Sequence, residues 1–401
     1  MHNRCTAIRT ELPEPLEPPE PPEPTQPFDP STQHPMNTQI IQERMAKLIA
    51  SMRDRHIDVL CIGANAWRSD YLRYAIDVTL LEGEAMAFIE GDGTIALLVQ
   101  SATEARRLQK EYPQFNTVHA HPYYPLVKER LNGLGSKAVS AAPLVAMPQA
   151  LLHHPWAQPI EATVQWIDLL MLHKSGAEAD AVEHAAQFAD QGYAGFAKAA
   201  KVGVKEYELT AYTESWLRQQ GCPENFMIMG SGGVEVRGMH PPGERVLQKG
   251  DLVTTELTPC VDGYYAQICR TLVLGQPSAL QLKCYQVFQE ALVAGIDAVK
   301  PGATHGEVAT AQNDVFRKYG LGEYVGSQYT RVRGHGMGLF VDGAHVLEDV
   351  KLVLEPNMTL IVHPNTYHPE VGYMVLGDTV RVTQTGCKVL NQTSRDLLVV
   401  D

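Results

Sequence analysis

The chain has 401 residues, of which 44% are hydrophobic and 20% are charged, a composition typical of a globular protein with room for two sizeable cores. Its net charge of −13 disfavours a nucleic-acid-binding protein, which would present a basic face to the phosphates. No apolar run is long enough to cross a bilayer and the first residues lack the pattern of a secretion signal, so we expect a cytoplasmic protein with neither membrane nor nucleic-acid partners. Seven scattered cysteines without CxxC spacing predict reduced thiols.

The first 36 residues differ in composition from the rest of the chain. They contain ten of the 26 prolines and six acidic residues. Such a segment lacks the apolar side chains needed for a core, so we predict a disordered, Pro-rich leader at residues 1–36. Residues 37–166 then have the pattern of an N-terminal α/β domain, and residues 167–401 form a second domain.

Helical and strand-like patterns alternate along both domains. In the N-terminal domain, residues 58–63 predict a buried strand and residues 85–99 predict a hairpin. No phosphate-cradling glycine fingerprint occurs there, so nucleotide binding has no support. The second domain opens its first helix with a capping box, Ser175 to Glu178. Further helices are expected at 206–220, 279–299 and 305–319, and strands at 227–236 (interrupted by the glycines of 230–233), 358–363 and 372–382.

The central feature of the second domain is a hairpin within residues 250–271. Asp262-Gly263 is a dipeptide that tolerates the positive φ of a tight turn, and it places Glu256 opposite Cys269. Because side chains alternate between the faces of a strand, polar groups gather on one face. That face carries Thr254, Glu256, Thr258, Tyr265, Gln267, Cys269 and Thr271. We interpret it as the floor of a polar site, with a half-exposed structural sheet as the alternative.

Several motifs of the second domain occur in the order found in one family. They are GMHPP (238–242), GDLVTTELTP (250–259), DGYYAQICRT (262–271), RGHGMG (333–338), LEPNMTLIVHPNTY (354–367) and GYMVLGDTVRVTQTG (372–386). Over about residues 40–395 the chain thereby resembles the pita-bread family of creatinase, aminopeptidase P, prolidase and methionine aminopeptidase. The resemblance implies an α/β (α+β) fold, in which a creatinase-type N-terminal α/β domain precedes a pseudo-twofold pita-bread domain. It also implies a homodimer that acts on a small-molecule substrate.

The resemblance identifies the positions at which peptidases of this family bind two divalent metals. Those enzymes use two aspartates, one histidine and two glutamates. The corresponding residues here are Glu256, Gln267, His335, His363 and Gly377. These five positions supply one carboxylate, too few anionic groups to offset the repulsion between two adjacent divalent ions. We therefore expect no dinuclear centre.

Creatinase is the precedent in this family for a metal-free site, and its catalytic histidine corresponds to His240. We therefore predict a creatinase-like hydrolase of a C–N bond in a small amino or amido acid, with His240 as general acid/base. Creatine itself is a poor candidate, because the two active-site glutamates of creatinase correspond to Cys269 and His363. The remaining candidates are His335, His363 and Glu256 for catalysis, and Arg331, Arg333, Gln267 and Cys269 for substrate binding. Cys269 is alternatively a nucleophile or inert packing.

Two other functions use the same residues. Glu256, His335 and His363 have the ligand types of mononuclear enzymes, which would hold a single divalent metal such as Fe, Mn or Zn and act as a lyase, oxygenase or hydrolase. A catalytically inactive homologue that keeps the cleft for binding is the third hypothesis.

Overall fold

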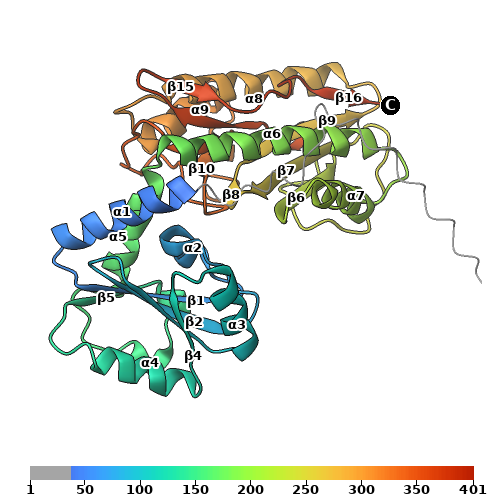
Figure 1. Cartoon of the computed structure of the whole chain (residues 1–401). Coiled ribbons are helices and arrows are strands. Elements are labelled where there is room, and N and C mark those ends of the chain that lie inside the picture. The colour runs from blue at the N-terminus through green and yellow to red at the C-terminus, as the bar shows by residue number, and fades with distance from the viewer. Residues whose placement is uncertain (1–37) are drawn as a thin grey trace, which may run out of the picture.

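The computed structural model describes residues 38–401, so the leader predicted at residues 1–36 lies outside the described residues. The described chain forms two large sheets that are covered by helices (Figure 1). Helix α5 (Ile160–Leu172) leads from the first sheet toward the second. None of the helices in this part of the chain is long and apolar enough to cross a membrane.

A five-stranded sheet organises the N-terminal part. Its order is β4-β3-β2-β1-β5, with β1 antiparallel to β2 and parallel to β5. The strand predicted at residues 58–63 and the hairpin predicted at residues 85–99 are confirmed as β1, β2 and β3. The strands are β1 (Val59–Asn65), β2 (Glu84–Glu90), β3 (Ile95–Val99), β4 (Asn116–His119) and β5 (Val139–Ala142), and the helices are α1 (Thr38–Asp54), α2 (Asp70–Ile76), α3 (Ala102–Glu111) and α4 (Tyr123–Asn132), with short 3-10 turns η2 (Leu144–Ala146) and η3 (Gln149–Leu151).

A nine-stranded sheet organises the second part, with the main order β10-β11-β14-β9-β7-β6. Helices α6, α8 and α9 lie along one face of it (Figure 1). The helices are α6 (Gly176–Ala199), α7 (Glu206–Gln219), α8 (Ala279–Ala298) and α9 (His305–Lys318), with the 3-10 turn η4 (Gly322–Val325). The strands are β6 (Glu224–Gly232), β7 (Leu252–Val261), β8 (Tyr264–Tyr265), β9 (Ile268–Leu274), β10 (Gly334–Gly336), β11 (Thr359–Val362), β14 (Gly377–Val382), β15 (Cys387–Val389) and β16 (Leu398–Val400), beside a separate hairpin of β12 (Thr366–His368) and β13 (Gly372–Met374).

Local sequence signals determine several of these boundaries. The predicted capping box is present at the start of α6, where Ser175 Oγ accepts from the Glu178 amide at 3.2 Å and Glu178 Oε2 accepts from the Ser175 amide at 2.8 Å. Helix α5 runs across the domain boundary predicted between residues 166 and 167. Both residues there are buried, so the chain continues through that point without a linker.

Strand β6 differs from its prediction, because it runs without a break through Gly230. Gly230 pairs with Thr254 of β7, and a Cβ there would meet Thr254 Oγ1 at 3.2 Å and the Gly238 carbonyl at 3.3 Å. The glycine therefore permits a close approach of the following loop rather than ending the strand.

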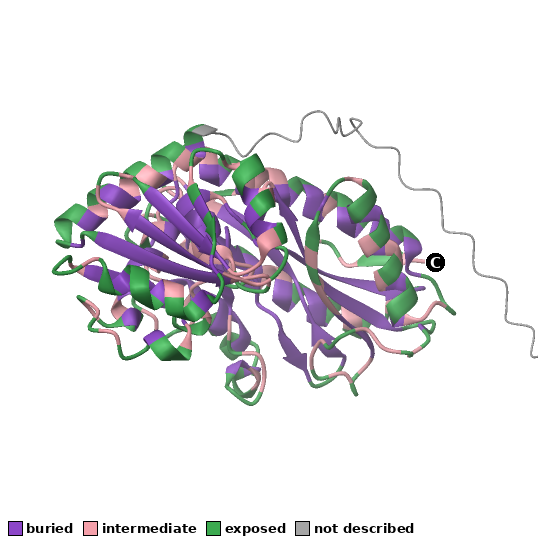
Figure 2. Cartoon of the chain, turned by 60° about the horizontal axis from the view of Figure 1, so that its bottom comes forward, coloured by how far each residue is buried: buried purple, intermediate pink, exposed green. Residues whose placement is uncertain are grey.

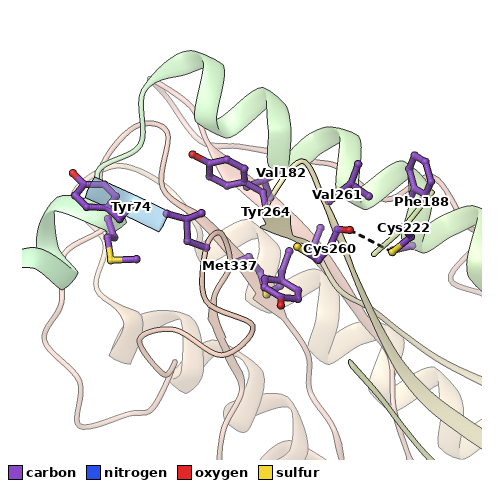
Figure 3. Close-up of a cluster of buried hydrophobic side chains, with 14 of the residues drawn as sticks. Tyr74, Val182, Phe188, Cys222, Cys260, Val261, Tyr264 and Met337 are labelled. Carbon is purple, nitrogen blue, oxygen red and sulfur yellow. Dashed lines mark hydrogen bonds between the residues drawn. The ribbon is translucent and has the colours of Figure 1, made fainter. Parts of the chain in front are cut away.

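Buried residues fill the strands of both sheets, between helices whose outer faces are exposed (Figure 2). One hydrophobic cluster includes side chains from both sheets and their helices. Figure 3 shows part of it, in which Tyr74 of α2 lies near Tyr264 and Met337 of the second domain. The N-terminal domain thus packs directly against the tip of the central hairpin.

Candidate active site

The floor of the site is the hairpin predicted from the Asp262-Gly263 turn. Both turn residues have positive φ angles, 51° and 80°. Strands β7 and β9 pair Glu256 with Cys269, which confirms the predicted register. Glu256 therefore lies on β7, which is flanked by β9 and by β6 at the end of the main sheet order.

Gln267 and Cys269 lie beside Glu256 on this floor. Gln267 is 2% exposed and donates through Nε2 to Cys269 Sγ at 3.4 Å. Burial raises the pKa of the Cys269 thiol well above its usual range, and the charge of Glu256 raises it further. A thiol that stays protonated is a poor nucleophile, so the inert alternative for Cys269 is favoured. Substrate binding by these two residues stays a prediction.

Glu256 is held by an amide side chain. Its Oε1 accepts a hydrogen bond from Asn365 Nδ2 at 2.7 Å. Asn365 is itself fixed, because its Oδ1 accepts from the Leu376 amide at 3.1 Å and its carbonyl accepts from Arg333 at 3.0 Å. Burial raises the pKa of Glu256 to about 7, although hydrogen bonds from Asn365 and Gln267 oppose the shift. A carboxyl group with this pKa can both take up and release a proton near neutral pH.

His335 and His363 approach each other from neighbouring strands. Their ring centroids are 5.5 Å apart, and the side chains are almost fully buried. Burial lowers the pKa of both rings, so they are neutral at physiological pH. His335 Nδ1 lies 3.6 Å from Asp342 Oδ1. His363 Nδ1 has no hydrogen-bond partner within the described part of the chain, an unusual state for a buried polar atom.

The residues present do not fit the two-metal centre of the family. A Cβ built on Gly377 would lie 2.6 Å from His363 Cβ and 2.9 Å from the Val362 carbonyl oxygen. In this arrangement a side chain at position 377 has no room, because its Cβ would collide with the Cβ of His363 and with the Val362 backbone.

A single-metal centre at Glu256, His335 and His363 also lacks support in the distances. Within the described residues, the group of three or more Cys, His, Asp or Glu side chains whose ligand atoms all lie within 4.8 Å of one another is elsewhere, at Cys284, His368 and Glu370. A mononuclear centre would require the three site residues to move together.

His240 lies apart from these residues. Its backbone bridges to Met229 of β6, which pairs with Thr255 of β7. Cross-strand partners project from the same face, and Thr255 projects opposite to Glu256, so His240 projects away from Glu256. On that side its Nδ1 lies 3.9 Å from Glu206 Oε2 at the start of α7. The position of His240 therefore gives no support to its predicted role as the general acid/base.

Arg331 and Arg333 differ although they are close in sequence. Arg331 is exposed and binds Asp349 through Nη2 at 3.0 and 3.1 Å. Arg333 has no exposed surface; its Nε donates to Asn313 Oδ1 at 2.5 Å and its Nη1 donates to backbone carbonyls, including that of Asn365. Arg333 thus supports the segment that positions Asn365, and its predicted contact with substrate gains no support.

A hollow adjoins the site on the side of Asp342. It has a volume of about 460 Å³ and lies between the loop of the N-terminal domain that contains Arg68, helix α5 and the segment after His335. Lys174 lines it and is buried, which lowers the pKa of its ammonium group to about 8. The volume suits a small molecule.

The sequence interpretation missed Asn365, the residue in direct contact with Glu256. A signal was present, because Asn365 lies two positions after His363 in the same motif. The structure closes this step with a hydrogen bond from the Asn365 amide to the His363 carbonyl at 2.8 Å, so the two residues lie in one tight turn between β11 and β12.

A mixed α/β domain followed by a helix-covered sheet with the polar site on its open face defines a pita-bread hydrolase. The chain belongs to metallopeptidase family M24, whose family model matches residues 180–384. It is 30% identical over 275 residues to a probable dipeptidase PepE of Mycobacterium bovis, covering 67% of this chain and 72% of that protein. It is 24% identical over 361 residues to a Xaa-Pro dipeptidase of Pyrococcus furiosus, covering 89% and 100%.

The fold agrees with these relationships. A crystal structure of dipeptidase PepE from Mycobacterium ulcerans superposes with a TM-score of 0.76 at 26% identity and covers 91% of this chain and 99% of that one. The family and its dipeptidase members identify this chain as a C–N hydrolase of the Xaa-Pro peptidase family.

Proposed function

We propose that this M24 member hydrolyses a C–N bond in a small amino or amido acid, short peptides included, without a dinuclear metal centre. The observation that carries the proposal is the position of His363. Its Cβ and the Val362 carbonyl oxygen leave no room for a side chain at Gly377, while Glu256, the one remaining carboxylate of the ligand set, is held by an amide. In place of the family's acidic ligand set, the site offers one carboxylate, an amide and two histidines, groups that can donate or transfer protons.

Glu256 is the proton-transfer group of this proposal. With a pKa of about 7, it takes a proton from the attacking water and returns it to the leaving amine. Asn365 fixes one of its oxygens at 2.7 Å, and Gln267 also donates a hydrogen bond to the carboxyl group. The sequence favoured His240 for this role, and the present proposal assigns it to Glu256, which lies on the polar face.

The two neutral histidines supply hydrogen bonds to the substrate. A neutral imidazole has one N–H donor and one acceptor nitrogen. His363 Nδ1 is unpaired within the described residues, so it is available to the carbonyl group whose C–N bond is cleaved. Donors that are fixed in advance stabilise the oxyanion of a tetrahedral intermediate at little cost in reorganisation.

The adjoining hollow supports a small substrate with an anionic end. Arg68 and Lys174 contribute positive charge to its lining and are the groups that would contact a carboxylate, while Asp168, which accepts from the Tyr71 hydroxyl at 2.7 Å, and Asp342 are the acidic residues of the same lining. Since the dipeptidase relatives cleave short peptides, a free carboxylate is the group we expect there. The homodimer and the cytoplasmic location expected from the sequence stay part of this proposal.

The test is turnover of a panel of dipeptides, Xaa-Pro dipeptides and N-acyl amino acids by protein treated with a chelator. We expect hydrolysis to survive chelation and to fall by about 10²–10⁴-fold in Glu256→Gln, the span usual for losing a general acid or base. His240→Ala is the comparison variant, and its rate should stay within a few-fold of the wild type. Activity that requires added cobalt or manganese would contradict the proposal, and a larger loss in His240→Ala than in Glu256→Gln would restore the role predicted from the sequence.

A further inference from the structure

A second cluster of ligating side chains lies outside the candidate active site. Cys284 of α8, His368 at the end of β12 and Glu370 in the turn before β13 bring one sulfur, one nitrogen and one oxygen within 4.8 Å of one another. We propose that these residues bind a divalent transition-metal ion, with zinc preferred, which joins the β12–β13 hairpin to helix α8.

The chemistry of the three donors selects the metal. A thiolate, an imidazole and a carboxylate form a ligand set typical of zinc, whereas calcium and magnesium take oxygen ligands. Zinc bonds of about 2.0–2.3 Å place neighbouring ligands about 3.5 Å apart in a tetrahedron. The three ligand atoms lie within 4.8 Å of one another, so a small movement of one ligand brings them to tetrahedral spacing. A water molecule completes the fourth position.

Glu370 is the ligand that can make this movement. It is exposed and forms no ion pair with the described residues, whereas Cys284 and His368 are 3% and 6% exposed and fixed in position. The turn itself is well defined, because the Val371 amide donates to the His368 carbonyl at 3.3 Å and Gly372 packs against the Gly233 carbonyl. Two ligands are therefore preorganised and the third closes over the ion.

The charge of the cluster favours a cation. Glu370 brings a negative charge beside Cys284, with the positive charge of Lys283 on α8 opposing it. A bound divalent ion would stabilise the thiolate, and the thiolate with the carboxylate would neutralise the ion.

The hydrogen bonding of His368 is compatible with ligation. Its Nδ1 accepts the Glu370 amide at 3.2 Å, so in the neutral ring this nitrogen carries a lone pair and Nε2 carries the hydrogen. That tautomer ligates through Nδ1, with the long amide contact exchanged for a metal bond.

A metal at this place would stabilise the active site from a distance. Strand β12 begins at Thr366, immediately after Asn365, which holds Glu256. Helix α8 packs against β11, which ends just before His363. An ion that fixes the hairpin to α8 thus restricts both ends of the segment that carries Asn365.

Cobalt(II) alone, titrated into the full chain, tests the proposal because thiolate-bound cobalt has a charge-transfer absorption in the near ultraviolet. We expect one equivalent to produce this band, zinc to displace it, and zinc to raise the melting temperature of the wild type. The band should be lost in Cys284→Ser and in His368→Gln. These variants remove different ligands on different elements, so a folding defect in one of them still leaves the other as a test.

Two controls separate this site from the rest of the chain. Cys387→Ser removes another thiol near α8 and should keep the band, as should His363→Gln in the candidate active site. The absence of a thiolate band in the wild type, or a band that survives Cys284→Ser, would overturn the proposal. Binding that is lost in His363→Gln would place the ion at the active site instead.

Discussion

Strands β9 and β14 carry polar residues on both faces of the sheet, and the two faces differ in how those residues are paired. On the helix-covered face, Arg270 and Asp378 are each 1% exposed and pair at 2.7 Å, and Arg395 completes the carboxylate at 2.6 Å. One residue earlier in each strand, Cys269 and Gly377 face the open side, where no such pairing exists among the described residues. The helix face satisfies its buried charges, whereas the open face keeps groups such as His363 Nδ1 unpaired. Hydroxyl groups near Arg270, those of Tyr193 and Tyr285, also lack partners among the described residues, so the difference between the faces concerns the pairing of charges.

The largest expected effect is on the satisfied face. Arg270→Met leaves Asp378 in the interior without its main partner and removes hydrogen bonds to the Cys269 and Gly377 carbonyls. We expect the free energy of unfolding to fall by about 3–5 kcal/mol, measured by urea denaturation. Lys388→Met removes an exposed pair with Glu183 and should cost less than about 1 kcal/mol. Equal costs for the two variants would contradict the distinction between the faces.

The pH dependence of stability tests the open face. The pKa of Glu256 is about 7 in the folded state against an ordinary value of 4.5, so between these values the folded protein binds more protons than the unfolded chain. The contribution of Glu256 to stability therefore falls as the pH rises from about 4.5 to 7, by at most about 3 kcal/mol at 1.36 kcal/mol per pKa unit. Glu256→Gln should remove this decline in denaturation measured across the same window. A decline that persists unchanged in the variant would show that Glu256 keeps its ordinary pKa.

A smaller effect tests the pairing of His363 with Gly377. Gly377→Ala introduces a Cβ against His363 Cβ and should cost about 1–3 kcal/mol through overpacking. Gly386→Ala is the matched control, because a Cβ there meets no atom within 4 Å. In the double variant with His363→Gly, which removes the opposing Cβ, the cost of Gly377→Ala should fall, and the part that remains reflects the contact with the Val362 carbonyl oxygen. Strict additivity in this double-mutant cycle would mean that the two positions do not compete for space.

Local signals in the sequence predicted the parts of the fold that neighbouring residues determine. The Asp262-Gly263 turn fixes the register of β7 with β9, because a two-residue turn leaves one pairing. The Ser175 capping box fixes the start of α6 in the same way. The motifs identified the family, and the loss of the metal ligands, read from the same short segments, stays a prediction.

The parts of the site that depend on distant segments were not predicted. The face to which His240 projects is set by its bridge to Met229, a contact that no local pattern encodes. Arg331 and Arg333 lie two positions apart in the sequence. Arg331 is exposed to solvent, whereas Arg333 is buried and donates to the Asn365 carbonyl. The hydrogen bond from Asn365 to Glu256 joins residues 109 positions apart. Such contacts follow from packing of the whole sheet rather than from spacing.

Metal content measures the central claim most directly. Protein purified without added metal or chelator should contain at most one divalent ion per chain, and Cys284→Ser, which removes the ligand proposed at the hairpin, should contain essentially none. Elemental analysis of the wild type, Cys284→Ser and Glu256→Gln would show how many ions each protein holds and at which site. Two ions per chain that persist in Cys284→Ser and disappear in Glu256→Gln would contradict the account, because they would show that a dinuclear centre forms at Glu256 despite His363 and Gly377.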